Sequence, residues 1–207
     1  MSFARTSPTS DPAIPTFPVR RFSLDEYHWL IDNGFLTPND KVELIHGWLV
    51  TKMPQNPPHR TCIGRLNAAL CALVSGDWSV LPQGPISTKD SEPEPDFALV
   101  KSAALDSPTE HPRPKDVALV VEVSDSTLAF DQGEKFRLYA ASHIPVYWVV
   151  NIPDGRVEVY TQPRRGKNPT YRECAEYGPG DEVPVVVAGG EIGRIPVLTI
   201  MPFLAGS

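Results

Sequence analysis

The sequence predicts a mixed α and β fold, in which a central mixed sheet is flanked by helices and carries extra N-terminal and C-terminal strands. The run VALVVEV, residues 117–123, is typical of a strand buried on both faces. Two segments, near residues 59–74 and 131–142, have apolar residues at helical spacing. Short strand-like segments lie before, between and after them. Both long helices are expected to pack against the sheet.

Composition limits the class of protein. The 207 residues are 41% hydrophobic and 21% charged, which is typical of a soluble globular protein, and we expect a cytoplasmic location because no apolar run has the length of a signal peptide or membrane span. The three cysteines include no CxxC pair, which excludes a zinc ribbon. Residues 1–19 are rich in Pro, Ser and Thr, so we expect a flexible arm followed by one domain over residues 20–207.

The formal net charge of -6 has the wrong sign for a protein that coats nucleic acid through bulk electrostatics. A polyanionic substrate would need a local basic patch or bridging metal ions.

The N-terminal elements have clear boundary signals. Ser23 and Glu26 have the spacing of a capping box, and the helix that they begin is expected to end at Asn33 and Gly34. The segment KVELIHGWLVTK then reads as a hairpin of two short strands around His46 and Gly47.

The second helix is predicted from about His59 to Val74. We expect both of its cysteines, Cys62 and Cys71, to pack in the core, and His59 more often to cap the helix than to contact a phosphate. Short strands are expected from Trp78 to Val100, followed by a proline-containing surface loop over residues 101–115.

In the C-terminal half, the buried strand is followed by a helix predicted from Asp131 to about Ser142, with Asp131 and Glu134 as a capping pair. We expect a strand hairpin around the Pro-Asp-Gly turn at residues 153–155, formed by the segments VYWVVNI and RVEVYTQP. The remaining residues read as irregular short strands.

Three carboxylates stand at unusual positions in the predicted sheet. Glu122 lies within the valine run, and a buried carboxylate needs a cation nearby. Asp96 begins another strand and Glu43 lies in the hairpin. Carboxylate oxygens suit Mg²⁺ or Mn²⁺, so a hard-cation site is one interpretation. The alternative is ordinary structure: a half-exposed Glu43 and an Asp96 that caps a turn.

Lys135 falls in the first turn of the predicted helix, where the helix dipole disfavours a cation. An ordinary i,i+4 pair with Asp131 would account for it, and so would a role beside Glu122. Spacing alone leaves both interpretations open.

The order of motifs resembles the Uma-two family of restriction endonucleases, in the PD-(D/E)XK nuclease superfamily. The resemblance runs from Phe22 to Phe203 through ELIHGWLV, PPH, EPDFALV, LVVEVSDST and IPVYWVVN, with Asp131, Lys135 and Tyr139 following the fourth motif. The superfamily's usual lysine position is Ser124 here, and the resemblance implies that Lys135 replaces it from the helix. His46 stands where the family usually has Asp.

The resemblance implies a metal-dependent endonuclease that hydrolyses DNA with Mg²⁺ or Mn²⁺ and could pair as a homodimer. Its active site would comprise Glu43, Asp96, Glu122 and Lys135, with Asp96, Glu122 and Glu43 as metal ligands. Two other classes stay open: a catalytically silent nuclease-like module that binds DNA or protein, and a structural domain in which the acids and Lys135 form a buried ion-pair network.

Overall fold

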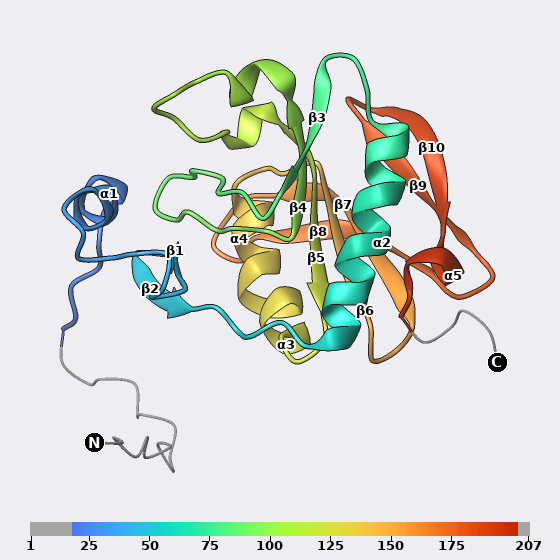
Figure 1. Ribbon diagram of the computed structural model, residues 1–207, viewed down its shortest axis with the longest axis horizontal. Helices are drawn as coiled ribbons and strands as arrows, with labels where there is room; N and C mark the ends of the chain where they lie inside the picture. The colour runs from blue at the N-terminus through green and yellow to red at the C-terminus, as the bar shows by residue number, and fades with distance from the viewer. Residues whose placement is uncertain (1–17, 203–207) are drawn as a thin grey trace, which may run out of the picture.

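A six-stranded sheet forms the centre of the computed structural model, which describes residues 18–202 (Figure 1). The strand order is β3-β4-β5-β6-β7-β8. The strands are β3 (Trp78–Pro82), β4 (Phe97–Lys101), β5 (Val117–Ser124), β6 (Val146–Asn151), β7 (Arg156–Arg164) and β8 (Thr170–Tyr177). The fold is therefore mixed, as predicted. Of the expected N-terminal arm, residues 1–17 lie outside the described residues.

Strands β5 and β6 pair in parallel, whereas the other neighbours in this sheet are antiparallel. A parallel pair needs a crossover connection, and the helical segment between β5 and β6 provides it. This arrangement places β5, with Glu122, near the middle of the sheet and leaves the helix that follows it to return over one face.

The two faces of the sheet bury separate apolar clusters because side chains alternate along each strand. Leu119, Val121 and Val123 of β5 pack in the cluster under α2 (Pro57–Leu73). Val120 packs in the other cluster, which α4 (Phe136–Ala141) covers. Helices consequently lie on opposite sides of the sheet (Figure 1), and Glu122 points toward the α4 side.

Helix α2 begins two residues earlier than predicted. Asn56 is its N-cap and accepts a hydrogen bond from the backbone N–H of His59, so His59 does not cap this helix. Cys62 is buried, but Cys71 is exposed, and the prediction that both cysteines are core residues is wrong for Cys71. Because nine residues separate them, the two thiols lie on different faces of α2, and only the face with Cys62 packs against the sheet.

The crossover helix also differs from the prediction. It begins at Leu128 and consists of α3 (Leu128–Phe130), a π-helical turn η3 (Asp131–Lys135) and α4. Asp131 has helical dihedral angles and is buried, so the predicted capping pair of Asp131 and Glu134 is wrong. Lys135 lies beyond the first turn, and the helix dipole no longer opposes its charge.

The N-terminal elements are as predicted. Helix α1 (Leu24–Asp32) has the Ser23–Glu26 capping box, and β1 (Val42–Ile45) pairs with β2 (Trp48–Thr51) around His46 and Gly47. Both turn residues have positive φ, at 50° and 78°, as a two-residue hairpin requires. Backbone hydrogen bonds from Glu92 to Leu44 and from Gly47 to Asp90 attach this hairpin to the loop before β4.

The C-terminal residues form β9 (Glu182–Val187), β10 (Gly190–Pro196) and α5 (Val197–Ile200), whose apolar side chains join the cluster under α2. The loop over residues 101–115 contains the short turns η1 (Ser102–Leu105) and, at its end, η2 (Pro114–Asp116). No helix within residues 18–202 is long and apolar enough to cross a membrane.

The cysteine positions generate a thiol-labelling prediction. Burial raises the pKa of the Cys62 thiol to about 12, whereas Cys71 and Cys174 are exposed. A chromogenic disulfide reagent at pH 8 should react with Cys71 and Cys174 in the native protein and with all three thiols after denaturation. The variant Cys71→Ala should show one native thiol, and rapid labelling of Cys62 in the native protein would contradict this packing.

Candidate active site

Strand pairing brings Asp96 and Glu122 together. Phe97 of β4 pairs with Val121 of β5 in antiparallel register, so the residues just beyond this pair, Asp96 and Glu122, are neighbours. Asp96 Oδ2 accepts a hydrogen bond of 2.8 Å from the backbone N–H of Val123, which fixes its side chain across the two strands. The side chain of Asp96 therefore binds the backbone of β5 and does not cap the turn after Pro95.

Lys135 reaches Glu122 from the helix above this face of the sheet. Its Nζ lies 3.0 Å from Glu122 Oε1 and 3.3 Å from Glu43 Oε1. The Tyr139 hydroxyl donates a second hydrogen bond, of 2.7 Å, to Glu122 Oε1. Glu43, Glu122 and Lys135 are 4%, 4% and 6% exposed, so this ion-pair network is removed from bulk water. Glu43 is not the half-exposed strand residue of the alternative interpretation.

His59 approaches the same site from α2. Its Nε2 lies 3.3 Å from Asp96 Oδ2, and its Nδ1 is a buried atom with no hydrogen-bond partner among the described residues. The spacing of His59 at the start of a helix suggested capping. Only the tertiary packing of α2 against the start of β4 brings its ring to Asp96.

Asp131 is a fourth carboxylate near the site. Its Oδ2 accepts hydrogen bonds from the Ser124 and Thr127 hydroxyl groups, at 2.7 and 2.6 Å. The Tyr147 hydroxyl donates to the Asp131 carbonyl oxygen at 3.0 Å, within the π-helical turn where backbone pairing departs from the α-helical pattern. These contacts hold in place the turn that carries Lys135.

The site has more acid than base, and its pKa values reflect this. Four carboxylates surround one lysine and one histidine: Glu43, Asp96, Glu122 and Asp131. Burial raises the pKa of Glu122 to about 8; Lys135 opposes this shift, and the neighbouring Asp131, Asp96 and Glu43 add to it. Burial alone would lower the pKa of Lys135, but the charges of Glu122, Glu43 and Asp131 raise it. The lysine is therefore charged, and the cluster can accept one more positive charge.

His59 and Asp131 follow the same electrostatics. Burial opposes protonation of His59, but the hydrogen bond and the charge of Asp96 raise its pKa. Burial raises the pKa of Asp131, although Lys135 and two hydroxyl groups oppose the shift.

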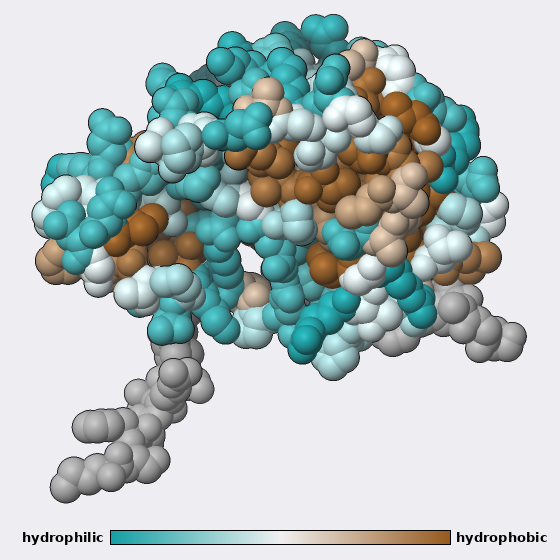
Figure 2. Space-filling model, turned by 45° about the horizontal axis from the view of Figure 1, so that its top comes forward, coloured by the Kyte–Doolittle hydropathy of each residue, from teal (hydrophilic) through white to brown (hydrophobic). Residues whose placement is uncertain are grey.

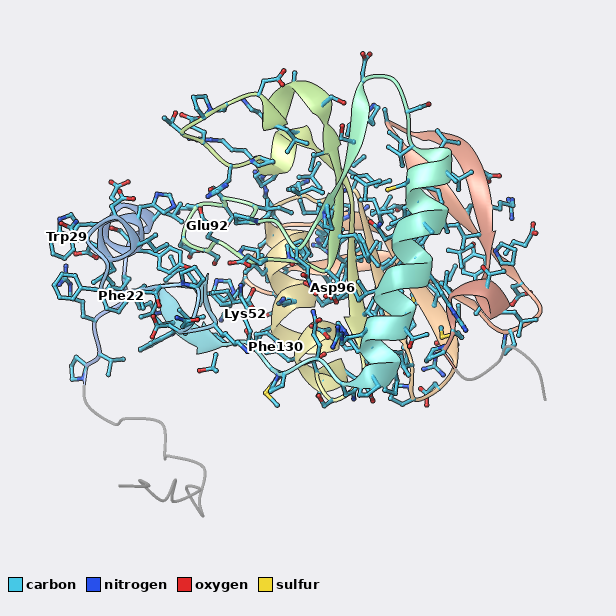
Figure 3. The ribbon with its side chains drawn as sticks, viewed as in Figure 1. Phe22, Trp29, Lys52, Glu92, Asp96 and Phe130 are labelled. Carbon is cyan, nitrogen blue, oxygen red and sulfur yellow. The ribbon has the colours of Figure 1, made fainter. Side chains whose placement is uncertain are left out.

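The acids lie at a cavity of about 950 Å³ between the N-terminal hairpin and the crossover helix. Glu43, Asp96, Glu122 and Lys135 all line it, together with His59 and residues of the segment from Thr51 to Gln55. Figure 2 shows the molecule hollowed between its N-terminal part and the rest, with mostly hydrophilic residues around the hollow. Asp96, Lys52 and Phe130 lie around this region in Figure 3.

The donor set of this cavity fits a hard divalent cation. Within residues 18–202, neither Asp96 Oδ1 nor Glu122 Oε2 accepts a hydrogen bond, so each acid keeps one oxygen for a ligand. No group of three or more His, Cys, Asp or Glu side chains in these residues is arranged to hold a metal ion. Mg²⁺ commonly uses only one or two carboxylates and completes its coordination shell with water and substrate phosphate. Two acids with a free oxygen each are therefore compatible with the absence of a three-ligand group in residues 18–202.

All four residues expected from the resemblance thus come together at one cavity. Sequence reasoning missed two neighbours. Tyr139 appears in the order of motifs but has no predicted role at the site, although its position four residues after Lys135 puts it on the same helical face. His59 carried no signal that links it to Asp96, because the contact joins elements far apart in the chain.

Comparison with known proteins agrees with this fold. A family model described as "Putative restriction endonuclease", Uma2, matches residues 24–192. The crystal structure of a "putative nuclease belonging to DUF820" from Anabaena variabilis matches with a TM-score of 0.65 at 15% identity, covering 88% of this chain and 99% of that one. No curated protein sequence matches this chain.

The family model spans most of the chain, and the structural match extends the agreement to the fold. The chain belongs to the Uma2 family.

Proposed function

We propose that the protein is a metal-dependent endonuclease that hydrolyses DNA phosphodiester bonds. One observation carries the proposal: Asp96 and Glu122, on adjacent strands, each keep one oxygen without a hydrogen bond among the described residues, while Lys135 binds the other oxygen of Glu122. The family match and the structural match agree with a nuclease.

Asp96 and Glu122 would hold Mg²⁺ or Mn²⁺. Glu43 would assist as an outer ligand, because its two oxygens already contact Lys135 and the backbone N–H of Glu94. When bound, the ion would supply positive charge to the scissile phosphate and lower the pKa of a water molecule. The acidic excess around Glu122 supports this assignment, because the ion would take the place of the proton that Glu122 otherwise retains.

Lys135 would stabilise the charge that develops on the phosphate and orient the attacking water. An ammonium group has three N–H donors. One of them binds Glu122 Oε1, and the ammonium also lies 3.3 Å from Glu43 Oε1. A further donor would be available to a phosphate oxygen or a water molecule in the cavity. Because the two glutamates hold the ammonium in place, it would need little reorganisation during the reaction.

A catalytically silent module and a purely structural ion-pair network are the competing functions. The structural network accounts for Lys135, Glu122 and Glu43, and Asp96 has its own contacts with His59 and Val123. The network gives no role to the oxygens of Asp96 and Glu122 that accept no hydrogen bond among the described residues. All residues proposed for the chemistry come from one chain, so the reaction at one site does not require the homodimer that the resemblance allows.

Replacement of the two acids tests metal binding and activity together. Asp96→Asn and Glu122→Gln should each abolish nicking of plasmid DNA with Mn²⁺ or Mg²⁺, and titration calorimetry should show loss of Mn²⁺ binding. Asp106→Asn, a change of the same kind at an exposed aspartate, should keep both. Absence of wild-type cleavage on plasmid and single-stranded DNA with either metal would contradict the enzyme function.

Lys135→Ala separates catalysis from metal binding. Cleavage should fall by ~100-fold or more, because one preorganised charge stabiliser is lost, while Mn²⁺ still binds. Removal of the ammonium leaves Glu122 and Glu43 without their cation, so the metal-free variant should also lose roughly 3 kcal/mol of stability at pH 8. Lys115→Ala, at an exposed lysine, is the control for both measurements. Unaltered cleavage by Lys135→Ala would refute its catalytic role.

The raised pKa of Glu122 predicts how metal-free stability depends on pH. Between the ordinary value of 4.5 and about 8, the folded protein keeps a proton on Glu122 that the unfolded chain releases. Stability should therefore fall as the pH rises through this window, by about 1.4 kcal/mol per unit at most.

Thermal unfolding of metal-free protein from pH 5 to pH 8 measures this dependence. Glu122→Gln should flatten the profile, and Mn²⁺ should raise the wild-type melting temperature more at pH 8 than at pH 5. Stability of the wild type that rises across the window would contradict the assignment.

A further inference from the structure

The walls of the cavity carry cationic and apolar side chains that the proposed chemistry does not use. We propose that this cavity accepts a single nucleic-acid strand with unpaired bases, one base packing against Phe130 and Met53 while its phosphate reaches the position where Asp96 and Glu122 would hold a divalent cation. This inference rests on the proposed function and names the substrate class of the same site.

Three cations surround the acidic floor. Lys41 and Lys52 flank the N-terminal hairpin, and Arg60 lies in the first turns of α2; all three line the cavity. Lys52 pairs with Glu94, but Lys41 and Arg60 are exposed and have no ion-pair partner within residues 18–202. Lys41 and Arg60 are therefore available to contact the strand. They would bind the phosphates on either side of the scissile bond.

Apolar side chains also line the cavity, and Met53 and Phe130 are the largest of them. Met53, in the segment that joins β2 to α2, is 58% exposed. Phe130, at the end of α3, is half-buried and packs with one side on the core cluster under α4. An aromatic ring and a thioether beside phosphate-binding cations are the combination that binds unpaired bases, because each base has an apolar face.

The burial of the proposed catalytic residues in the cavity favours a single strand over a duplex as the ligand. Glu122 and Lys135 are 4% and 6% exposed, so a phosphate has to enter the cavity to reach them. A cavity of about 950 Å³ has room for a ligand of drug-like size, which corresponds to one or two nucleotides. In a duplex the bases are stacked and paired, and bringing one against Phe130 would require unstacking it.

Binding measurements test the substrate class without relying on cleavage. Fluorescence anisotropy with labelled oligo(dT), oligo(U) and an oligo(dT)·oligo(dA) duplex of equal length, with and without Mg²⁺, should show at least ~10-fold tighter binding of a single strand than of the duplex. Preference for oligo(dT) or for oligo(U) would identify the strand as DNA or RNA. A gel run after each titration checks that the strand is intact.

Phe130→Ala should weaken strand binding by roughly 5- to 100-fold, as loss of one stacking contact does. Phe130→Leu keeps apolar packing on the core but lacks the aromatic face, so it should show a similar loss even if the alanine variant folds poorly. Phe22→Ala is the matched control, since Phe22 lies on the N-terminal part away from Asp96 and Phe130 (Figure 3) and should bind normally.

Duplex binding as tight as strand binding, or unchanged strand binding by folded Phe130→Leu, would overturn the inference and leave the proposed nuclease function intact. Strand-selective binding that depends on Phe130, without cleavage of any strand in Mg²⁺ or Mn²⁺, would instead support the binding site and reject the nuclease function.

Discussion

The buried contacts of the Lys135 ammonium with Glu122 and Glu43 are the interaction on which the site depends. They join three parts of the chain: the central strand β5, the crossover helix and the N-terminal hairpin. A buried ammonium needs partners at close range, so none of these parts can move far without exposing an uncompensated charge. Together with the backbone hydrogen bonds that attach the hairpin to the loop before β4, these contacts hold the hairpin beside the sheet and so define the cavity between them.

The π-helical turn is the local irregularity in the crossover helix that carries Lys135. It lies between two ordinary helical segments and carries Asp131 and Lys135 at its two ends, both of them buried. Hydrogen bonds from Ser124 and Thr127 to the Asp131 carboxylate, and from Tyr147 to its carbonyl oxygen, stabilise the turn. Irregular helical turns of this kind are frequent at functional sites because they direct side chains that a regular helix would turn elsewhere.

The excess of acidic side chains at the site bears on how an acidic protein could bind the nucleic acid that the proposed function requires. Without a bound cation the four carboxylates would repel a phosphate, and the exposed side chains of Lys41 and Arg60 are among those that line the cavity. Binding of nucleic acid at this site would thus be linked to binding of metal, and the acidic remainder of the surface would oppose adsorption of nucleic acid elsewhere.

The sequence alone determined the fold class, the N-terminal capping box and hairpin, and the doubly buried strand that contains Glu122, because each depends on local periodicity and turn chemistry. It also indicated Asp96, Glu43 and Lys135 as a set, through the resemblance of several motifs in order. The start of the crossover helix was predicted wrongly, since Asp131 has the residue type of a cap but is drawn inward by Ser124 and Thr127. Only the tertiary structure decided that His59 contacts Asp96 and Tyr139 contacts Glu122, because these contacts join separate elements whose relative positions result from packing on the two faces of the sheet.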